Sequence, residues 1–281
     1  MNAEPVANAR AFLAEVTPYL LADEAVHCVV LGVAGDIVRH GGGTATQYWV
    51  VRDERGAVAG AALFGAARNL ALSRMTGYAV QALAAQLRRG QVELTGAGGP
   101  ADETALFASL WAGNEVEAQL DHTEHVWELG RVTASTASRG LLSVAGWADL
   151  EELAAWTPEA ATAFGLTAEE WDEEVGTAVE RGQLYLWRDS GLVAMAMIRG
   201  ETPTGLRVSG VFTPAVAQRL GYATSLVSAV SRAALDSGRQ RVFLFTDTRN
   251  ATAEGIYARI GYQQVGMAKR YRFVPPGNEI G

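Results

Sequence analysis

The stretch QRLGYA, Gln218 to Ala223, combines residue types that suit a phosphate-binding turn. It lies between the strand-like run VSGVF and TSLVSAVSRAALDSG, where apolar residues recur at helical spacing. A helix N-terminus offers unpaired backbone N–H groups and a positive dipole end, and both favour a phosphate or pyrophosphate. Gly221 lets an anion approach the backbone closely, while Gln218 and Arg219 supply a neutral donor and a positive charge. We therefore predict an anion site here, although an ordinary strand-to-helix loop explains this pattern alone equally well.

A second polar stretch follows about one helix later, where the strand-like run VFLFT leads into DTRNATAEGIYARIGY. Asn250 stands at the expected N-cap, and Tyr257 lies two turns inside the helix that follows. The two stretches together form a more specific pattern than either one alone.

The elements that position these residues occur twice in the chain. Gln47 to Leu63 and Gln183 to Ile198 each read as an aromatic-rich strand, an Arg-Asp turn and a second apolar strand, which predicts two β-hairpins. Gln91 to Trp111 can be laid without a gap on Arg241 to Gly261, with strand, polar loop and helix in the same order. We interpret the chain as one αββ and αβα unit used twice.

A Ser/Thr/Ala-rich stretch, RVTASTASRG, separates the two copies. We expect a first domain at 1–130, a linker at 131–139 and a second domain at 140–281.

Composition bounds the function. The chain has 281 residues, 49% of them hydrophobic, and a formal net charge of -8, so it can bury a sizeable core and is a poor partner for nucleic acid. We find no signal-peptide pattern and no apolar run of membrane-spanning length, so we expect a cytoplasmic protein that binds no membrane. Cys28, the single cysteine, is interpreted as a small buried apolar residue.

From Gly140 to Phe273 the chain resembles the GNAT superfamily of acyl-coenzyme A-dependent N-acyltransferases. The resemblance rests on VSGVFT, QRLGYA, Asn250, Tyr257 and the IGY of Ile260 to Tyr262. It implies an α/β fold with α+β mixed sheets: two GNAT-like domains in tandem, each a mostly antiparallel mixed sheet flanked by helices. Tandem members with a degenerate N-terminal half are the subgroup it is most similar to.

The resemblance also implies the site. The glycine loop would bind the pyrophosphate of acetyl-CoA, the preceding strand would pair with the pantetheine arm, and a strand N–H would polarise the thioester carbonyl. Tyr257 would be the catalytic acid near the sulfur. The residues implied for acetyl-CoA binding are Val211, Phe212, Thr213, Gln218, Arg219, Leu220, Gly221, Tyr222, Ala223, Thr224 and Asn250.

The implied reaction is direct attack of a primary amine on the thioester, which needs a group to take the amine proton. We assign that role to none of the carboxylates near the motifs, which are interpreted as solvated helix charges: Glu169, Glu170, Asp172, Glu173, Glu174 and Glu254.

The first copy lacks the proposed acid, because Tyr257 falls on Phe107 and Asn250 on Pro100 in the overlay. RMTGYA, Arg74 to Ala79, formally matches the glycine loop, but LALS runs almost directly into it. We expect the first copy to wall the substrate cleft rather than to catalyse. Its binding of CoA is left open.

Two other patterns are set aside. The glycines Gly41 to Gly43 precede a strand rather than a helix, so they are interpreted as a loop. His122 and His125 lack the further ligands that a metal site needs, so we predict no metal.

We predict an N-acetyltransferase that uses acetyl-CoA and an unidentified amine, in a monomer with two pseudo-equivalent domains. The alternatives are a non-catalytic acyl-CoA-binding or sensing protein and a structural pseudoenzyme.

Overall fold

The computed structural model describes residues 1–133 and 138–277. The first copy contains the strands β1 (Asn2–Val6), β2 (Gln47–Arg52), β3 (Val58–Phe64), β4 (Asn69–Leu72), β5 (Gly96–Pro100) and β6 (Glu117–Leu129). Its helices are α1 (Ala9–Leu20), α2 (Glu24–His40), α3 (Gly77–Arg89) and α4 (Ala101–Trp111), with a 3-10 turn at Leu21–Asp23. Strands β2 and β3 pair antiparallel, which confirms the first hairpin.

The second copy repeats this order with a longer helical segment. Its strands are β7 (Leu141–Val144), β8 (Leu184–Arg188), β9 (Leu192–Arg199), β10 (Gly205–Phe212), β11 (Arg241–Asp247) and β12 (Gln263–Val274). Its helices are α5 (Leu150–Ala154), α6 (Thr157–Phe164), α7 (Ala168–Glu180), α8 (Tyr222–Asp236) and α9 (Ala251–Ile260), with 3-10 turns at Trp147–Asp149 and Ala215–Ala217. Strands β8 and β9 form the second expected hairpin.

The strands form one continuous mixed sheet in the order β1-β2-β3-β4-β5-β12-β6-β11-β10-β9-β8-β7. Only β4–β5 and β10–β11 pair in parallel among the described residues, as expected for two copies of a mostly antiparallel unit. The α/β fold with mixed sheets flanked by helices is therefore confirmed. None of the helices that the structure describes is both long and apolar enough to cross a membrane.

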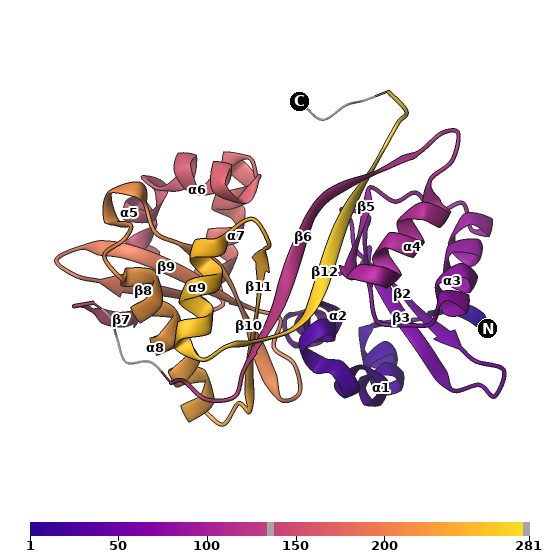
Figure 1. Ribbon diagram of the computed structural model, residues 1–281, viewed down its shortest axis with the longest axis horizontal. Helices are drawn as coiled ribbons and strands as arrows, with labels where there is room; N and C mark the ends of the chain where they lie inside the picture. The colour runs from indigo at the N-terminus through magenta and orange to yellow at the C-terminus, as the bar shows by residue number, and fades with distance from the viewer. Residues whose placement is uncertain (134–137, 278–281) are drawn as a thin grey trace.

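The last strand of each copy lies in the sheet of the other copy. β6 pairs with β11, while β12 pairs with β5, and the two long strands pair with each other. Figure 1 shows them crossing between the two lobes of the molecule. The boundaries at 1–130 and 140–281 remain a prediction, and residues 134–137 of the expected linker lie outside the described residues.

One strand of the first copy differs from the overlay. The strand expected at QVELT instead covers Gly96–Pro100, and α4 begins directly after it. Small residues are required there, because a Cβ at Gly96 would lie 2.5 Å from the Tyr271 carbonyl oxygen of β12. A Cβ at Gly99 would lie 2.6 Å from the Leu72 carbonyl oxygen of β4. Close backbone approach, rather than β propensity, selects this glycine-rich strand.

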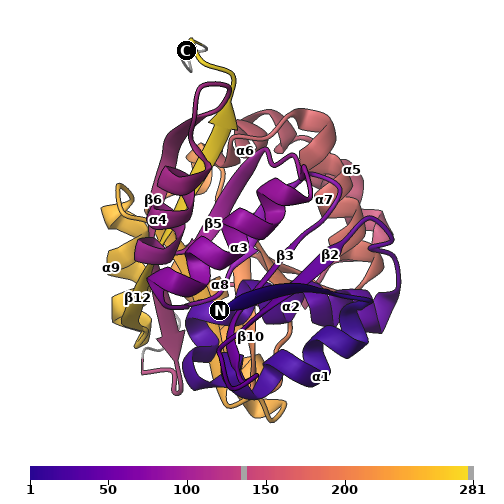
Figure 2. The same ribbon diagram turned by 90° about the vertical axis from the view of Figure 1, so that its right-hand side faces the viewer.

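Helices cover both faces of the sheet. In the first copy, α1 and α2 pack on one face and α3 and α4 on the other; Figure 2 looks onto α3 and α4. In the second copy, α8 and α9 cover one face and α5 to α7 the opposite face. Helix α2 also packs on Val126 and Phe243, on the side of the sheet opposite α8 and α9. Helices α2 and α7 thus share one face, although they come from different copies.

Helix α2 joins the two copies through backbone as well as side-chain contacts. The Glu24 carboxylate accepts hydrogen bonds from the backbone N–H and the hydroxyl of Thr204, in the turn between β9 and β10. In the middle of α2, a Cβ at Gly32 would lie only 2.3 Å from the Gly200 Cα. A side chain at residue 32 would therefore push the copies apart.

We expect Gly32→Ala to destabilise the protein by about 1–3 kcal/mol, because the added methyl group meets backbone that cannot move aside. The matched control is Gly176→Ala in α7, where a Cβ meets nothing within 4 Å. There the change should stabilise by about 0.5–1 kcal/mol, the helix preference for alanine. Urea unfolding of both variants measures the difference, and equal effects would contradict the proposed contact.

Candidate active site

Strands β10 and β11 separate after a short parallel pairing. They pair only from Gly205 to Arg207, although β10 continues to Phe212. The pairing of β10 with β9 shifts between Ser209 and Phe212, and Gly210 has a φ of 56°. This bulge bends the end of β10 away from β11. It leaves backbone groups of Val211, Phe212 and Thr213, three of the predicted residues, without partners in β11.

The loop after β10 holds a run of N–H groups without acceptors. Arg219 and Gly221 have φ of 63° and 84°, both in the left-handed region. The first hydrogen bond entering α8 runs from the Ser225 N–H to the Gly221 carbonyl. Within the described residues, the backbone N–H groups of 219–224 have no acceptor. Left-handed residues turn successive N–H groups into a concave anion site, and the dipole of α8 reinforces it.

Two side chains of the predicted loop hold its shape instead of pointing outward. The Gln218 amide donates to the Thr213 carbonyl at 3.0 Å, so it closes the loop on the end of β10. The Tyr222 hydroxyl donates to Asp189 at 2.8 Å, which ties the start of α8 to the β8–β9 turn. Leu220 is exposed, Ala223 is half-buried and Thr224 is buried. The loop therefore offers its backbone donors to an anion, and the exposed Arg219 side chain, which forms no ion pair with the described residues, adds a positive charge beside them.

Tyr257 lies on the buried face of α9, in the core shared with α8 and the sheet. Burial raises the pKa of its hydroxyl to about 12, so it stays protonated at neutral pH. Its ring meets Tyr262 edge-on, with the centroids 5.9 Å apart. The Tyr262 hydroxyl is bonded to Ser231 at 2.8 Å, whereas the Tyr257 hydroxyl has no such partner in the described part of the chain. Tyr257 is thus a neutral donor without an acceptor.

Two residues at the start of α9, Asn250 and Glu254, have different roles in the structure. The Asn250 side-chain oxygen accepts from the Ala253 N–H at 3.1 Å, which is an ordinary N-cap and leaves the amide NH2 free. Glu254 accepts from His125 at 2.5 Å. Because His125 lies on β6, this contact fixes α9 to a strand of the other copy. His125 and Glu254 are 129 positions apart in the sequence, so no local sequence pattern predicts their contact. The exchange of β6 into the sheet of the second copy brings them together.

The carboxylates on α7 have different partners. Glu170 caps the helix through Thr167, Asp172 accepts from the Thr157 hydroxyl, and Glu174 pairs with Arg199 at 2.6 Å. Glu169 and Glu173 are exposed. The interpretation as solvated helix charges holds for Glu169 but not for Glu254, which is half-buried against His125. Glu170, Glu173 and Glu174 line a groove between α7 and α2.

The matching loop of the first copy is filled by the protein's own groups. The Arg74 N–H donates to His27 Nε2 at 3.0 Å, and the Met75 N–H lies 3.4 Å from a Glu103 carboxylate oxygen. The Thr76 hydroxyl accepts from the Ala79 N–H at 3.4 Å, so it caps α3. A carboxylate and a capping hydroxyl therefore occupy donors of the kind that α8 leaves free.

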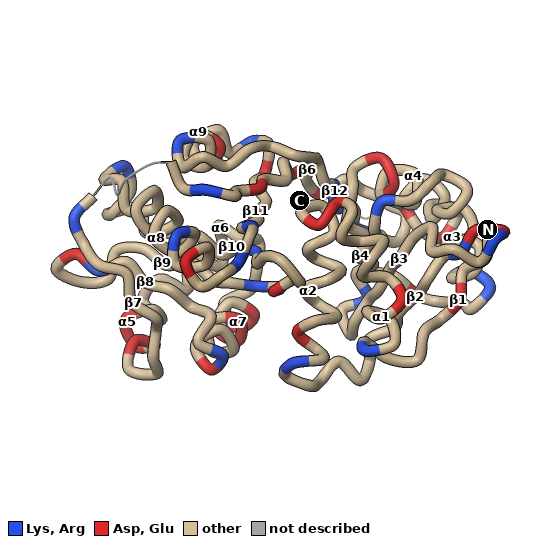
Figure 3. The backbone as a smooth tube through the Cα atoms, turned by 90° about the horizontal axis from the view of Figure 1, so that it is seen from below, with Lys and Arg blue, Asp and Glu red and all other residues tan. Residues whose placement is uncertain are grey.

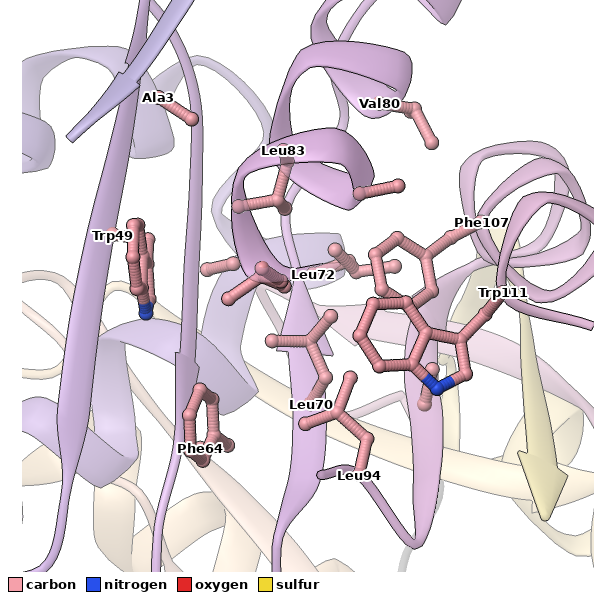
Figure 4. Packing of buried hydrophobic residues seen from close by; sticks show 14 of the residues in the cluster. Ala3, Trp49, Phe64, Leu70, Leu72, Val80, Leu83, Leu94, Phe107 and Trp111 are labelled. Carbon is pink, nitrogen blue, oxygen red and sulfur yellow. The ribbon is translucent and has the colours of Figure 1, made fainter. Parts of the chain in front are cut away.

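The rest of the first copy is equally closed. Strand β4 has four residues where β10 has eight, so no splayed arm follows its parallel pairing. Phe107, which overlays on Tyr257, is fully buried and stacks on Trp111 at 5.5 Å. Figure 4 shows both rings packed near Leu72 and Leu94. The position of the proposed acid is thus part of an apolar core.

Comparison with known proteins supports the resemblance. Residues 188–273 match the family model described as FR47-like protein, which is GNAT-related. No curated protein matches the sequence. A GCN5-related N-acetyltransferase from Sphaerobacter thermophilus is 15% identical, with a TM-score of 0.61 over 99% of this chain and 98% of that one. A GNAT-family acetyltransferase from Colwellia psychrerythraea is 14% identical, with a TM-score of 0.59 over 98% and 100%.

A third similar structure shares the two-domain organisation. It is a tandem GNAT protein from the clavulanic acid biosynthesis pathway, 14% identical, with a TM-score of 0.55 over 99% of this chain and 100% of that one. The chain therefore has the GNAT fold in its tandem form, as the sequence indicated. Its C-terminal half carries the FR47-like sequence match.

The filled loop of the first copy predicts a pH effect on stability. Burial lowers the pKa of His27 below 6.5 and outweighs the hydrogen bond with the Leu20 carbonyl and the nearby carboxylates, which raise the pKa. Below about pH 6.5, His27 is therefore protonated in the unfolded chain but stays neutral in the folded chain. The free energy of unfolding then falls as pH drops, by at most about 1.4 kcal/mol per pH unit. The pKa of His122 is raised, so its effect on stability is lost as pH rises above about 6.5 and does not overlap with that of His27.

We expect His27→Gln, which keeps a donor and an acceptor, to reduce the slope of unfolding free energy between pH 6.5 and about 5. His40→Gln, at the exposed end of α2, should leave the slope unchanged. Urea unfolding at several pH values provides the measurement, and parallel slopes for the native protein and His27→Gln would refute the assignment.

Proposed function

We propose that the protein transfers an acetyl group from acetyl-CoA to a primary amine, at one site in its C-terminal half. The observation that carries the proposal is the combination of free N–H groups at 219–224 with the splayed end of β10. The first suits a pyrophosphate and the second leaves backbone groups for an amide-containing arm. A plain strand-to-helix loop needs neither feature.

The proposed chemistry follows from these positions. Backbone N–H groups of Val211 to Thr213 would polarise the thioester carbonyl and stabilise the oxyanion that forms when the amine attacks. The new C–N bond forms, the C–S bond breaks, and the amine nitrogen releases its proton to solvent or to a nearby carboxylate. Tyr257, protonated because its pKa is about 12, would donate a hydrogen bond to the departing sulfur.

Tyr257 serves better as a hydrogen-bond donor than as a full proton donor. A free thiol has a pKa near 8.5, well below the value of about 12 for the Tyr257 hydroxyl, so complete transfer from tyrosine to thiolate is uphill. A charge-assisted hydrogen bond still lowers the energy of the leaving thiolate. The final proton on the thiol is then supplied by solvent.

The acetyl-CoA site can be tested with one charge. Leu220→Glu places a carboxylate beside the free N–H groups, where it favours the helix dipole but repels a pyrophosphate. We expect acetyl-CoA affinity, measured by isothermal titration, to fall at least tenfold, about 1.4 kcal/mol. The control is Tyr78→Glu at the start of α3, also exposed, which should leave binding unchanged with a stoichiometry near one. Absence of binding to the native protein would contradict the proposal.

The role of Tyr257 can be tested by removing its hydroxyl. Tyr257→Phe should lower kcat by on the order of 100-fold, the usual loss for a positioned donor, while the Kd of acetyl-CoA stays within about threefold. The control is Tyr262→Phe, which removes a hydroxyl bonded to Ser231 and should reduce stability but not kcat. Release of CoA thiol over a panel of primary amines measures both, and equal kcat values for native protein and Tyr257→Phe would exclude the role.

A further inference from the structure

A charged groove of about 430 Å³ lies between α7 and α2, on the face of the sheet opposite α8 and α9. One wall is formed by Val33 and Asp36 of the first copy, and the other by α7 of the second. Its floor includes Arg207 on β10 and the end of β9. Figure 3 shows the acidic stretches of α7 in red, with α2 beside it. Neither copy could form this groove alone.

The charges in the groove are ordered along α7. Glu170, Glu173, Glu174, Thr177 and Arg181 line it, and their spacing of three or four residues puts them along one side of the helix. Trp171 contacts Phe212 edge-on at 6.5 Å, so the acidic start of α7 lies beside the splayed end of β10. Arg181 is about 16 Å further along the helix, at the end where Arg199 and Arg207 lie.

Several of these charges have no partner of opposite sign. Glu174 and Arg199 pair with each other at 2.6 Å, so the unpaired charges of the groove are carboxylates near the start of α7 and arginines near its end. Glu173, Arg181 and Arg207 form no ion pair with any residue that the structure describes. The Arg207 guanidinium lies 5.8 Å from the centre of the Phe245 ring, and its Nε is buried without a hydrogen-bond partner. A half-buried cation with a free donor calls for an anion.

We propose that this groove binds the acceptor, and that the acceptor is a primary amine carrying a carboxylate several bonds from the amine. Resting on the proposed acetyl transfer, the assignment puts the ammonium group at Glu170 and Glu173, on the part of α7 whose Trp171 contacts Phe212 of the proposed acyl-CoA strand. The acceptor carboxylate lies at Arg207 and Arg181, where guanidinium groups bind it bidentately. Asp36 of α2 closes the groove from the other copy.

The position of Arg207 sets the length of the acceptor. Arg207 lies four residues before Val211, where the thioester is proposed to sit, which is about 13 Å along a strand. The arginine side chain spans part of this distance, and the acceptor must span the rest. An α-amino group and its own carboxylate are too close together to reach both ends, whereas an ω-amino acid or the side-chain amine of lysine can do so.

The test compares amines that differ in one feature. CoA release is measured with 6-aminohexanoate and lysine, with hexylamine, which lacks the carboxylate, and with glycine, which is too short. We expect kcat/KM for the first two to exceed that for hexylamine and glycine at least tenfold. Arg207→Met keeps the apolar stem on Phe245 but removes the charge, and should abolish this preference.

Two further variants make the result decisive. Arg181→Met, at an exposed position, should also weaken selection for the carboxylate, which keeps the test valid if Arg207→Met fails to fold. Arg232→Met, exposed on α8, should change nothing. Equal use of hexylamine and 6-aminohexanoate overturns the assignment of the groove. The assignment is also overturned if the protein binds acetyl-CoA but does not acetylate 6-aminohexanoate, and if titration of 6-aminohexanoate into CoA-saturated protein releases no heat. Failure to bind acetyl-CoA instead contradicts the proposed function itself.

Discussion

The exchange of β6 and β12 is the constraint on which the rest of the structure depends. Each long strand ends the sheet of the other copy, and the two pair with each other over most of their lengths. Because the backbone hydrogen bonds of both sheets pass through this pair, the copies cannot separate without exposing unpaired strand edges. The exchange therefore fixes the position of α2 relative to α7, and with it the width of the groove between them.

Local backbone geometry at β10 controls the candidate site. A bulge at Gly210 ends the parallel pairing with β11 after Arg207, and Arg219 in the left-handed region turns the following N–H groups outward. A non-glycine residue in that region costs about 1–3 kcal/mol and persists only where surrounding contacts enforce it. Here the bond from Gln218 to Thr213 and that from Tyr222 to Asp189 hold both ends of the loop. The loop keeps this conformation with its donors unpaired.

The two glycine loops show how one motif can have opposite roles. QRLGYA and RMTGYA share spacing, and both precede a helix. In the second copy the donors of the loop are free, whereas in the first His27 and Glu103 reach them from neighbouring helices. A carboxylate in the place of an anionic ligand gives a stable, closed structure. Two further features of the first copy agree with this closed structure: it has no splayed strand, and Phe107 occupies the position of the proposed acid.

Hydrophobic periodicity and turn residues in the sequence determined the repeated elements, both hairpins, the loop after β10 and the place of Tyr257 on the helix that follows Asn250, because these depend on neighbours close along the chain. The glycine-rich strand Gly96–Pro100 could not be found this way, since β12 and β4 select it through backbone contacts. Likewise, the pair His125–Glu254, the filled loop at Arg74 and the groove between α7 and α2 join residues far apart in sequence. Only the tertiary structure decided these, because strand exchange sets which surfaces meet, and no local preference encodes it.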